Sequence, residues 1–128
     1  MTRRRTINID PVRHGAPIPM AAVVGNVLMT SGVMGADPAT GELAESADDQ
    51  ARFAFENVQS VLDKAGGTLD DIVHITVFVK DFAYREAVNR PWLSLFPDEN
   101  DRPARHTVKA DLPGAMLVQL EVVAVLEG

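Results

Sequence analysis

The chain has 128 residues, of which 46% are hydrophobic and 23% charged, and its 12 Lys and Arg against 18 Asp and Glu give a formal net charge of -6. This length supports one hydrophobic core but not two, so we expect a single domain over residues 1–128. Cysteine is absent, which excludes disulfides, thiolate nucleophiles and metal sites built on thiolates, and makes the cytoplasm the default compartment.

The lengths of the apolar runs argue against a membrane protein, and the negative charge argues against a nucleic-acid-binding protein. No apolar run approaches the roughly 18 to 20 residues that cross a bilayer, so we expect no membrane association. An acidic chain lacks the clustered cations that neutralise phosphate groups, so we expect no nucleic-acid partner. The basic residues 3–5 lack the apolar core of an export signal, and we interpret them as a solvated arm.

The first half of the chain predicts a strand pair followed by a helix. Residues 23–31 read as two strands around the turn dipeptide Gly25-Asn26. Residues 37–41 (DPATG) read as a surface turn. Over residues 48–65 apolar side chains recur every three or four positions, with Ser46 as the N-terminal cap and a glycine pair, residues 66–67, as the stop.

The second half predicts a strand, a helix and two more strands. Residues 72–80 alternate, with Val73 on the apolar face. Residues 81–96 are helical in pattern, and the expected packing residues are Phe82, Tyr84, Val88, Trp92 and Leu95. Pro91 leaves two alternatives: either the helix kinks there, or Asn89 caps a short helix with Pro91 in its first turn. Strands follow over residues 104–110 and 116–126.

This order of elements predicts an α+β fold, in which two helices pack on one face of a mixed sheet. The last strand is apolar on both faces apart from Gln119 and Glu121. Two helices cover only one of these faces. We therefore expect the uncovered face to pack against other copies of the chain.

Glu121 and Arg105 are the residues whose chemistry stands out. A carboxylate within an apolar strand is costly to bury unpaired, and Arg105, which we place at the start of the adjoining strand, offers a planar fork of donors. A structural ion pair and an active site are equally consistent with this pattern. Likewise, Thr30-Ser31-Gly32 either lines a cleft or simply ends a strand.

Several other kinds of site are excluded by spacing. His14, His74 and His106 are isolated from one another and from other ligands, so we expect no metal. The chain also lacks a phosphate-binding glycine loop, a dinucleotide-binding turn and a nucleophile elbow.

Taken together, the motifs resemble those of the Rid (reactive intermediate deaminase) family, also called the YjgF family. The resemblance covers nearly the whole chain, and the order and spacing of the motifs carry it. The matching segments are GNVLMTSG at residues 25–32, DPATG at 37–41, the helix at 50–57, DIV at 71–73, TVFVKD at 76–81, Asn89, RPAR at 102–105 and LEVVAV at 120–125.

This resemblance implies a chorismate-mutase-like fold assembled as a homotrimer, with a central barrel and ligand clefts between subunits. It also implies a hydrolase that converts 2-imino acids to 2-keto acids and ammonia without cofactor or metal. By carry-over, Arg105 binds the substrate carboxylate and Glu121 positions or activates the attacking water. Ser31, Asn89 and the backbone at Thr107 complete the polar lining of the cleft.

The chain departs from the family pattern at two positions. Ile18 stands where the family usually has Tyr, and Thr107 stands where Cys is frequent. We hypothesise that the pocket is reshaped for a different imine, with His14 or His106 as replacement polar groups.

Three other functions compete with imine hydrolysis. The first is a non-catalytic or regulatory protein that binds carboxylates or keto acids in the same cleft. Older family labels suggest an endoribonuclease or translation inhibitor, which the acidic composition supports least. Chorismate mutase activity fits the implied fold, but the motifs favour the deaminases.

Overall fold

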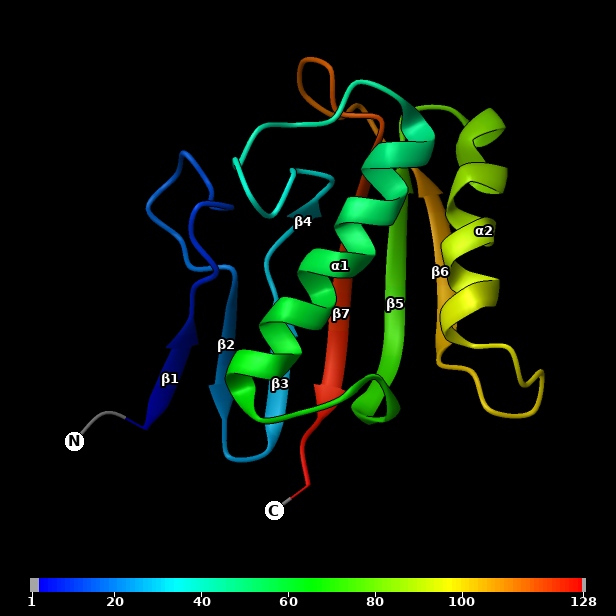
Figure 1. Ribbon diagram of the computed structural model, residues 1–128. Helices are drawn as coiled ribbons and strands as arrows, with labels where there is room; N and C mark the ends of the chain where they lie inside the picture. The colour runs from blue at the N-terminus through cyan, green and yellow to red at the C-terminus, as the bar shows by residue number, and fades with distance from the viewer. Residues whose placement is uncertain (1–2, 128) are drawn as a thin grey trace.

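A computed structural model describes residues 3–127 and contains a seven-stranded sheet with two helices in front of it (Figure 1). The strands follow the order β1-β2-β3-β7-β5-β6, and the short β4 also pairs with β7. The strands are β1 Arg4–Ile7, β2 Ala21–Val24, β3 Val27–Thr30, β4 Val33–Met34, β5 Ile72–Val79, β6 Ala104–Lys109 and β7 Val118–Val125. The helices are α1 Ala47–Ala65, α2 Arg85–Leu95 and the 3-10 turns η1 Leu69–Asp71 and η2 Phe82–Tyr84.

The sheet is mixed, as predicted. Among residues 3–127, only β5 and β6 pair in parallel, and the other strand pairings are antiparallel. Parallel neighbours need a crossover connection, and α2 supplies it here. The α+β fold with two helices on one face is therefore confirmed (Figure 1).

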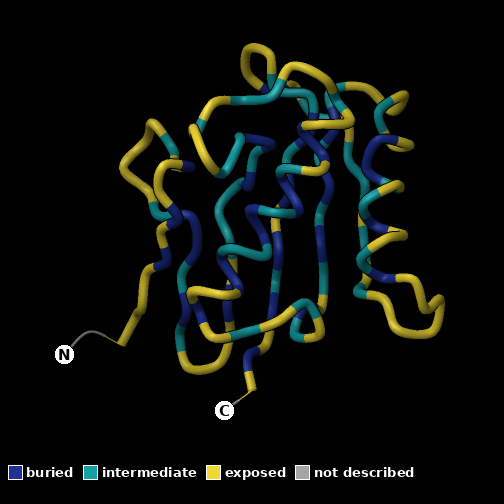
Figure 2. Tube along the Cα trace, viewed as in Figure 1, coloured by how far each residue is buried: buried dark blue, intermediate teal, exposed yellow. Residues whose placement is uncertain are grey.

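Local signals in the sequence set both ends of α1. Ser46 caps the helix by accepting a hydrogen bond from the backbone N–H of Asp49 at 3.1 Å. Gly66 ends it in the left-handed conformation, with φ 86°, which glycine adopts without strain. The buried stripe of α1 packs on the sheet and includes Phe55, Val58 and Leu62 (Figure 2).

Of the two alternatives for Pro91, the short capped helix is wrong. The helix α2 runs from Arg85 to Leu95 with Pro91 inside it. Val88 and Trp92 are buried as expected, but the prediction that Phe82 packs in the core is wrong, because its side chain is 43% exposed. Phe82 belongs to the preceding 3-10 turn, whose tighter winding breaks the helical periodicity.

Two predictions about strands also need correction. Val73 is 52% exposed, because a register shift between Ile72 and His74 turns it away from the core and leaves Ile72 buried in its place. Residues 3–5 are not simply a solvated arm, since Arg4 and Arg5 belong to β1 and pair with Val24 and Val23.

The core lies between the sheet and the helices, and the opposite face of the sheet is uncovered within this chain (Figures 1 and 2). Alternate residues of β7, such as Val118 and Leu120, are buried beneath α1. On the other face Met29 and Val125 are 56% and 42% exposed. The uncovered face is therefore confirmed, whereas the homotrimer stays a prediction.

Within residues 3–127, no helix is both long and apolar enough to span a bilayer. The same residues contain no cluster of His, Asp and Glu side chains suited to a metal ion.

Candidate functional site

Arg105 and Glu121 do not lie on adjoining strands, which corrects the sequence-based placement. β5 lies between their strands, so Arg105 pairs with Ile75 and Glu121 pairs with Thr76. Successive residues of a strand point to opposite faces. Ile75 is fully buried beneath the helices, so Arg105 faces the helices while Glu121 faces the uncovered side.

This arrangement excludes one of the two readings in its simplest form. No salt bridge within the described residues joins Arg105 to Glu121. A structural ion pair inside one chain is therefore wrong, whereas the active site stays a prediction. Each residue belongs to its own group of polar side chains, on opposite faces of the sheet.

The first group is built around Arg105, at the edge strand β6. Its guanidinium carbon lies 5.2 Å from the centroid of the Trp92 ring, and its Nε donates a hydrogen bond to Oγ1 of Thr107 at 3.2 Å. Desolvation by burial, followed by the positive charge of Arg85, lowers the pKa of Arg105 from its ordinary value. Stacking and one hydrogen bond thus fix the guanidinium and leave its terminal N–H groups free for a ligand.

Asn89 belongs to the same side of the molecule. It lies one turn before Trp92 on α2, so the two share a helix face. Its Nδ2 donates to Oε1 of Glu86 at 3.3 Å. Its remaining amide oxygen is available as an acceptor beside the Arg105 edge.

The second group surrounds Glu121 on the uncovered face. Glu121, Thr76 and His106 form one row across β7, β5 and β6. His106 therefore faces the Glu121 side of the sheet, although it follows Arg105 directly in sequence. Both Glu121 and His106 are exposed in the isolated chain.

Ser31 and Gly32 lie beside Glu121 at a bulge between β3 and β4. Met29 pairs with Val123 and Val33 with Leu120, so residues 30–32 face only residues 121–122. The Oγ1 of Thr30 takes the place of a ladder carbonyl by accepting from the N–H of Val122 at 2.9 Å. Such a bulge leaves backbone N–H and C=O groups without partners in the sheet, next to the carboxylate of Glu121.

Gly32, the last residue of this bulge, lies against the side chain of Gln119. A Cβ on Gly32 would approach the side chain of Gln119 to 2.5 Å. The backbone therefore lies close to β7 at this point, and any side chain at position 32 would displace Gln119.

The loop before β2 places Ile18 near the Glu121 group. Ser31 donates its hydroxyl proton to the carbonyl of Pro19 at 2.8 Å, which ties the bulge to this loop. Ile18 precedes that anchor and is 48% exposed. His14 is half-buried in the same loop, and within the described residues its Nε2 is buried without a hydrogen-bond partner.

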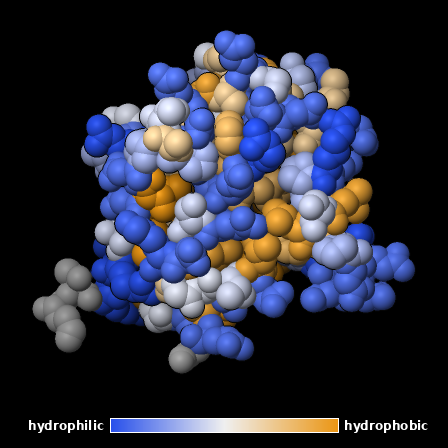
Figure 3. Space-filling model, in the orientation of Figure 1, coloured by the Kyte–Doolittle hydropathy of each residue, from blue (hydrophilic) through white to orange (hydrophobic). Residues whose placement is uncertain are grey.

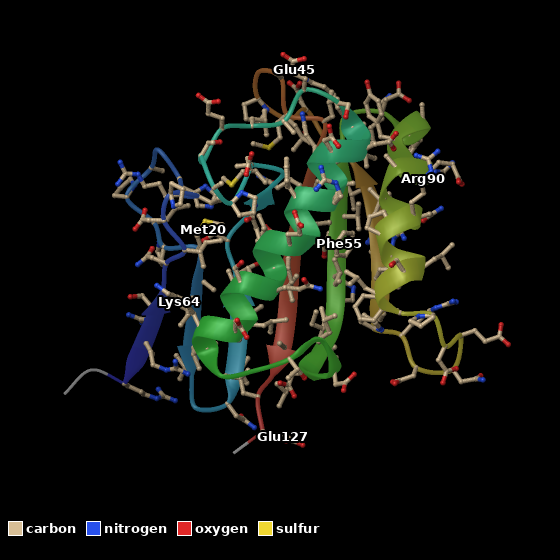
Figure 4. The ribbon with its side chains drawn as sticks, viewed as in Figure 1. Met20, Glu45, Phe55, Lys64, Arg90 and Glu127 are labelled. Atoms are coloured by element: carbon tan, nitrogen blue, oxygen red, sulfur yellow. The ribbon has the colours of Figure 1, made fainter. Side chains whose placement is uncertain are left out.

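A hollow of about 550 Å³ lies elsewhere, between α1 and α2. Figure 3 shows apolar side chains gathered between the helices, and Figure 4 shows Phe55 and Arg90 on either side. Its charged groups are paired with one another, as in Arg90 with Asp48. It contains none of the predicted site residues.

Sequence reasoning missed Trp92 as a functional residue and did not consider Arg85. Trp92 was assigned to packing alone, but its ring also supports Arg105. The sequence feature that indicates a role for both residues is the spacing of Arg85, Asn89 and Trp92. They occupy positions i, i+4 and i+7 and so lie on one helix face.

Comparison with known proteins assigns the chain to one family. The family model described as Endoribonuclease L-PSP matches residues 16–126. A RutC family protein of Haemophilus influenzae is 41% identical over 112 residues, covering 85% of this chain and 86% of that protein. A 2-iminobutanoate/2-iminopropanoate deaminase of Salmonella typhimurium is 39% identical over 104 residues, covering 80% of this chain and 81% of that protein.

The fold has close counterparts among solved structures. RidA from an Antarctic Psychrobacter superimposes with a TM-score of 0.86 at 31% identity, covering 95% of this chain and 99% of that one. The chain belongs to the Rid family, also called the YjgF family.

Proposed function

We propose that this protein hydrolyses 2-imino acids to 2-keto acids and ammonia in clefts between the subunits of a homotrimer. The names of relatives at 38% to 39% identity, 2-iminobutanoate/2-iminopropanoate deaminases, support an enzyme of this kind. The observation that carries the proposal is Arg105, which is supported by Trp92 and Thr107 and forms no ion pair within the described residues.

The opposite orientation of Arg105 and Glu121 supports a cleft shared between subunits. One chain holds them on different faces of its sheet. When a neighbouring subunit packs on the uncovered face, its edge strand β6, which carries its Arg105, comes close to Glu121 of the first subunit. The exposed apolar side chains of that face, such as Met29 and Val125, supply the contact area.

In this cleft Arg105 binds the substrate carboxylate with two N–H groups and fixes the imine carbon next to Glu121. Glu121 accepts a proton from water as the water oxygen bonds to that carbon. Glu121 passes this proton to the imine nitrogen, which gives the carbinolamine. Glu121 then takes the proton of the carbinolamine hydroxyl and transfers it to the nitrogen, so that the C–N bond breaks, ammonia leaves and the carbonyl of the keto acid forms.

An imine carbon is already electrophilic, so orientation and a weak carboxylate base suffice, and the proposal requires no cofactor or metal. Ser31, Asn89 and the backbone at Thr107 line the cleft. Ile18, with His14 or His106, adapts it to the side chain of the substrate.

The direct test is the rate of keto acid formation from imino acids that an amino acid oxidase generates in situ, with semicarbazide as the competing trap. We expect the unmodified protein to outcompete the trap and Arg105→Ala to lose this ability. The control Arg90→Ala, which replaces an exposed arginine of the same helical layer, should keep it. Ligand-induced stabilisation without turnover of small, apolar or aromatic imines would instead indicate a binding protein.

A further inference from the structure

A second arginine shares the helix face that contacts Arg105. Arg85, Asn89 and Trp92 are spaced by four and three residues along α2, so their side chains leave the helix on the same side. Trp92 contacts Arg105 from that side. Arg85 therefore faces the same edge of the sheet, two helical turns before Trp92.

The directions of the elements bring the two guanidinium groups toward each other. β5 and β6 run parallel, so the connecting α2 runs back in the opposite direction (Figure 1). Arg85, at the start of α2, lies toward the end of β6. Arg105 lies at the start of β6, but its hydrogen bond to Thr107 directs its guanidinium along the strand toward that same end.

Each of the two guanidinium groups is supported by an aromatic ring. The guanidinium carbon of Arg85 lies 4.9 Å from the centroid of the Phe82 ring, as that of Arg105 lies over Trp92. Stacking restricts an arginine while leaving its N–H edge free for hydrogen bonds. The positive charge of Arg85 also contributes to the lowered pKa of Arg105, after desolvation, which agrees with their proximity.

Neither arginine forms an ion pair with a carboxylate in the part of the chain that the structure describes. Within residues 3–127 the ion pairs involve other arginines, namely Arg13, Arg52 and Arg90. Glu86 is next to Arg85 in sequence, but its carboxylate accepts from Asn89. In a chain of net charge -6, two neighbouring unpaired cations repel each other unless an anion bridges them.

We propose that Arg85 binds a second anionic group of the substrate, so that the preferred substrates are 2-imino dicarboxylic acids. Arg105 holds the carboxylate next to the imine carbon, and Arg85 holds the carboxylate at the far end of the side chain. This inference rests on the proposed imine hydrolysis and specifies its substrate class.

The test compares imines made in situ from D-aspartate and D-glutamate with imines made from D-alanine and D-leucine. The measured quantity is the ratio of kcat/KM for the dicarboxylic imines to that for the monocarboxylic imines. We expect a ratio of at least about ten for the unmodified protein, because a charge-assisted contact contributes roughly that factor. Arg85→Ala should lower the ratio about fivefold or more, and Arg85→Lys should restore part of it.

Arg90→Ala is the matched control, since it removes an exposed arginine from the same helix and should leave the ratio unchanged. Thermal unfolding of each variant checks that Arg85→Ala is folded. Equal kcat/KM values for both classes of imine, or an unchanged ratio in Arg85→Ala, would overturn the inference and leave imine hydrolysis standing.

A binding measurement separates this inference from the proposed function. Calorimetry would give the dissociation constants of 2-oxoglutarate and of 2-oxobutanoate for the same variants. If no imine is hydrolysed, imine hydrolysis fails, but tighter binding of the diacid that is lost in Arg85→Ala still supports the role of Arg85. Equal affinities for the two keto acids would overturn that role.

Discussion

The Nε of Arg105 donates a hydrogen bond to Oγ1 of Thr107, 3.2 Å away on the same face of β6. This contact orients a guanidinium whose flat side already lies over Trp92. The hydroxyl thus gives the side chain of Thr107 a positioning role.

Replacing the hydroxyl without changing the shape of the side chain tests this role. Thr107→Val should lower kcat/KM for imine hydrolysis about fivefold, mainly through KM, since one hydrogen bond contributes about 1 kcal/mol. Thr107→Ser keeps the hydroxyl and should stay close to the unmodified protein. Steady-state kinetics with the oxidase-coupled assay measures both, and equal losses in the two variants would contradict the role.

A methyl group at position 32 tests whether the bulge forms part of the site. Gly32→Ala should displace the side chain of Gln119, shift the bulge beside Glu121 and lower kcat/KM, with a loss of about 1 kcal/mol in the free energy of unfolding. Gly15→Ala is the control, because a Cβ there meets nothing within 4 Å. Urea unfolding and kinetics measure both effects. A Gly32→Ala variant with full activity would show that the bulge does not form part of the site.

The uncovered face of the sheet should hold the subunits together. Val125→Glu places a charge among its exposed apolar residues and should convert the homotrimer to smaller species, with loss of activity. Light scattering after gel filtration should give three times the chain mass of 13.9 kDa for the unmodified protein. Leu93→Glu, at a similarly exposed leucine on α2, should remain trimeric, and a trimeric, active Val125→Glu would contradict this packing.

The N-terminal cap of α1 should contribute to the stability of the protein but not to its activity. Ser46→Ala removes the acceptor for the N–H of Asp49 and should lower the free energy of unfolding by about 1 kcal/mol. Denaturant unfolding at a fixed protein concentration measures this change, because oligomerisation makes stability depend on concentration. Ser94→Ala, an exposed serine of α2, is the control, and equal stability of both variants would show that the cap contributes little.

Features that depend on neighbouring residues were predictable from the sequence. The turn at Gly25-Asn26 joins β2 and β3, and the ends of α1 lie within a residue of those that Ser46 and Gly66 indicated. These signals work because a cap or a turn is decided by a few backbone hydrogen bonds nearby.

Features that depend on pairing between distant strands were not predictable. Nothing local indicates that β5 separates β6 from β7, so Arg105 and Glu121 were wrongly placed on adjoining strands. The register shift that exposes Val73 is likewise set by its partner strand. The spacing of Arg85 from Trp92 is a local feature of one helix, but the contact of Trp92 with Arg105 joins two distant segments, so the sequence does not indicate that Arg85 lies near Arg105.

The central claim is that one active site takes Arg105 from one subunit and Glu121 from another. The most direct measurement mixes two inactive variants, Arg105→Ala and Glu121→Gln, by co-expression with different affinity tags and purification of the mixed oligomers. A mixed trimer contains two copies of one variant and one of the other, and in either case one of its three clefts combines an intact Arg105 with an intact Glu121, so about a third of the unmodified activity should return. Mixed oligomers that remain as inactive as either variant alone would contradict a shared site.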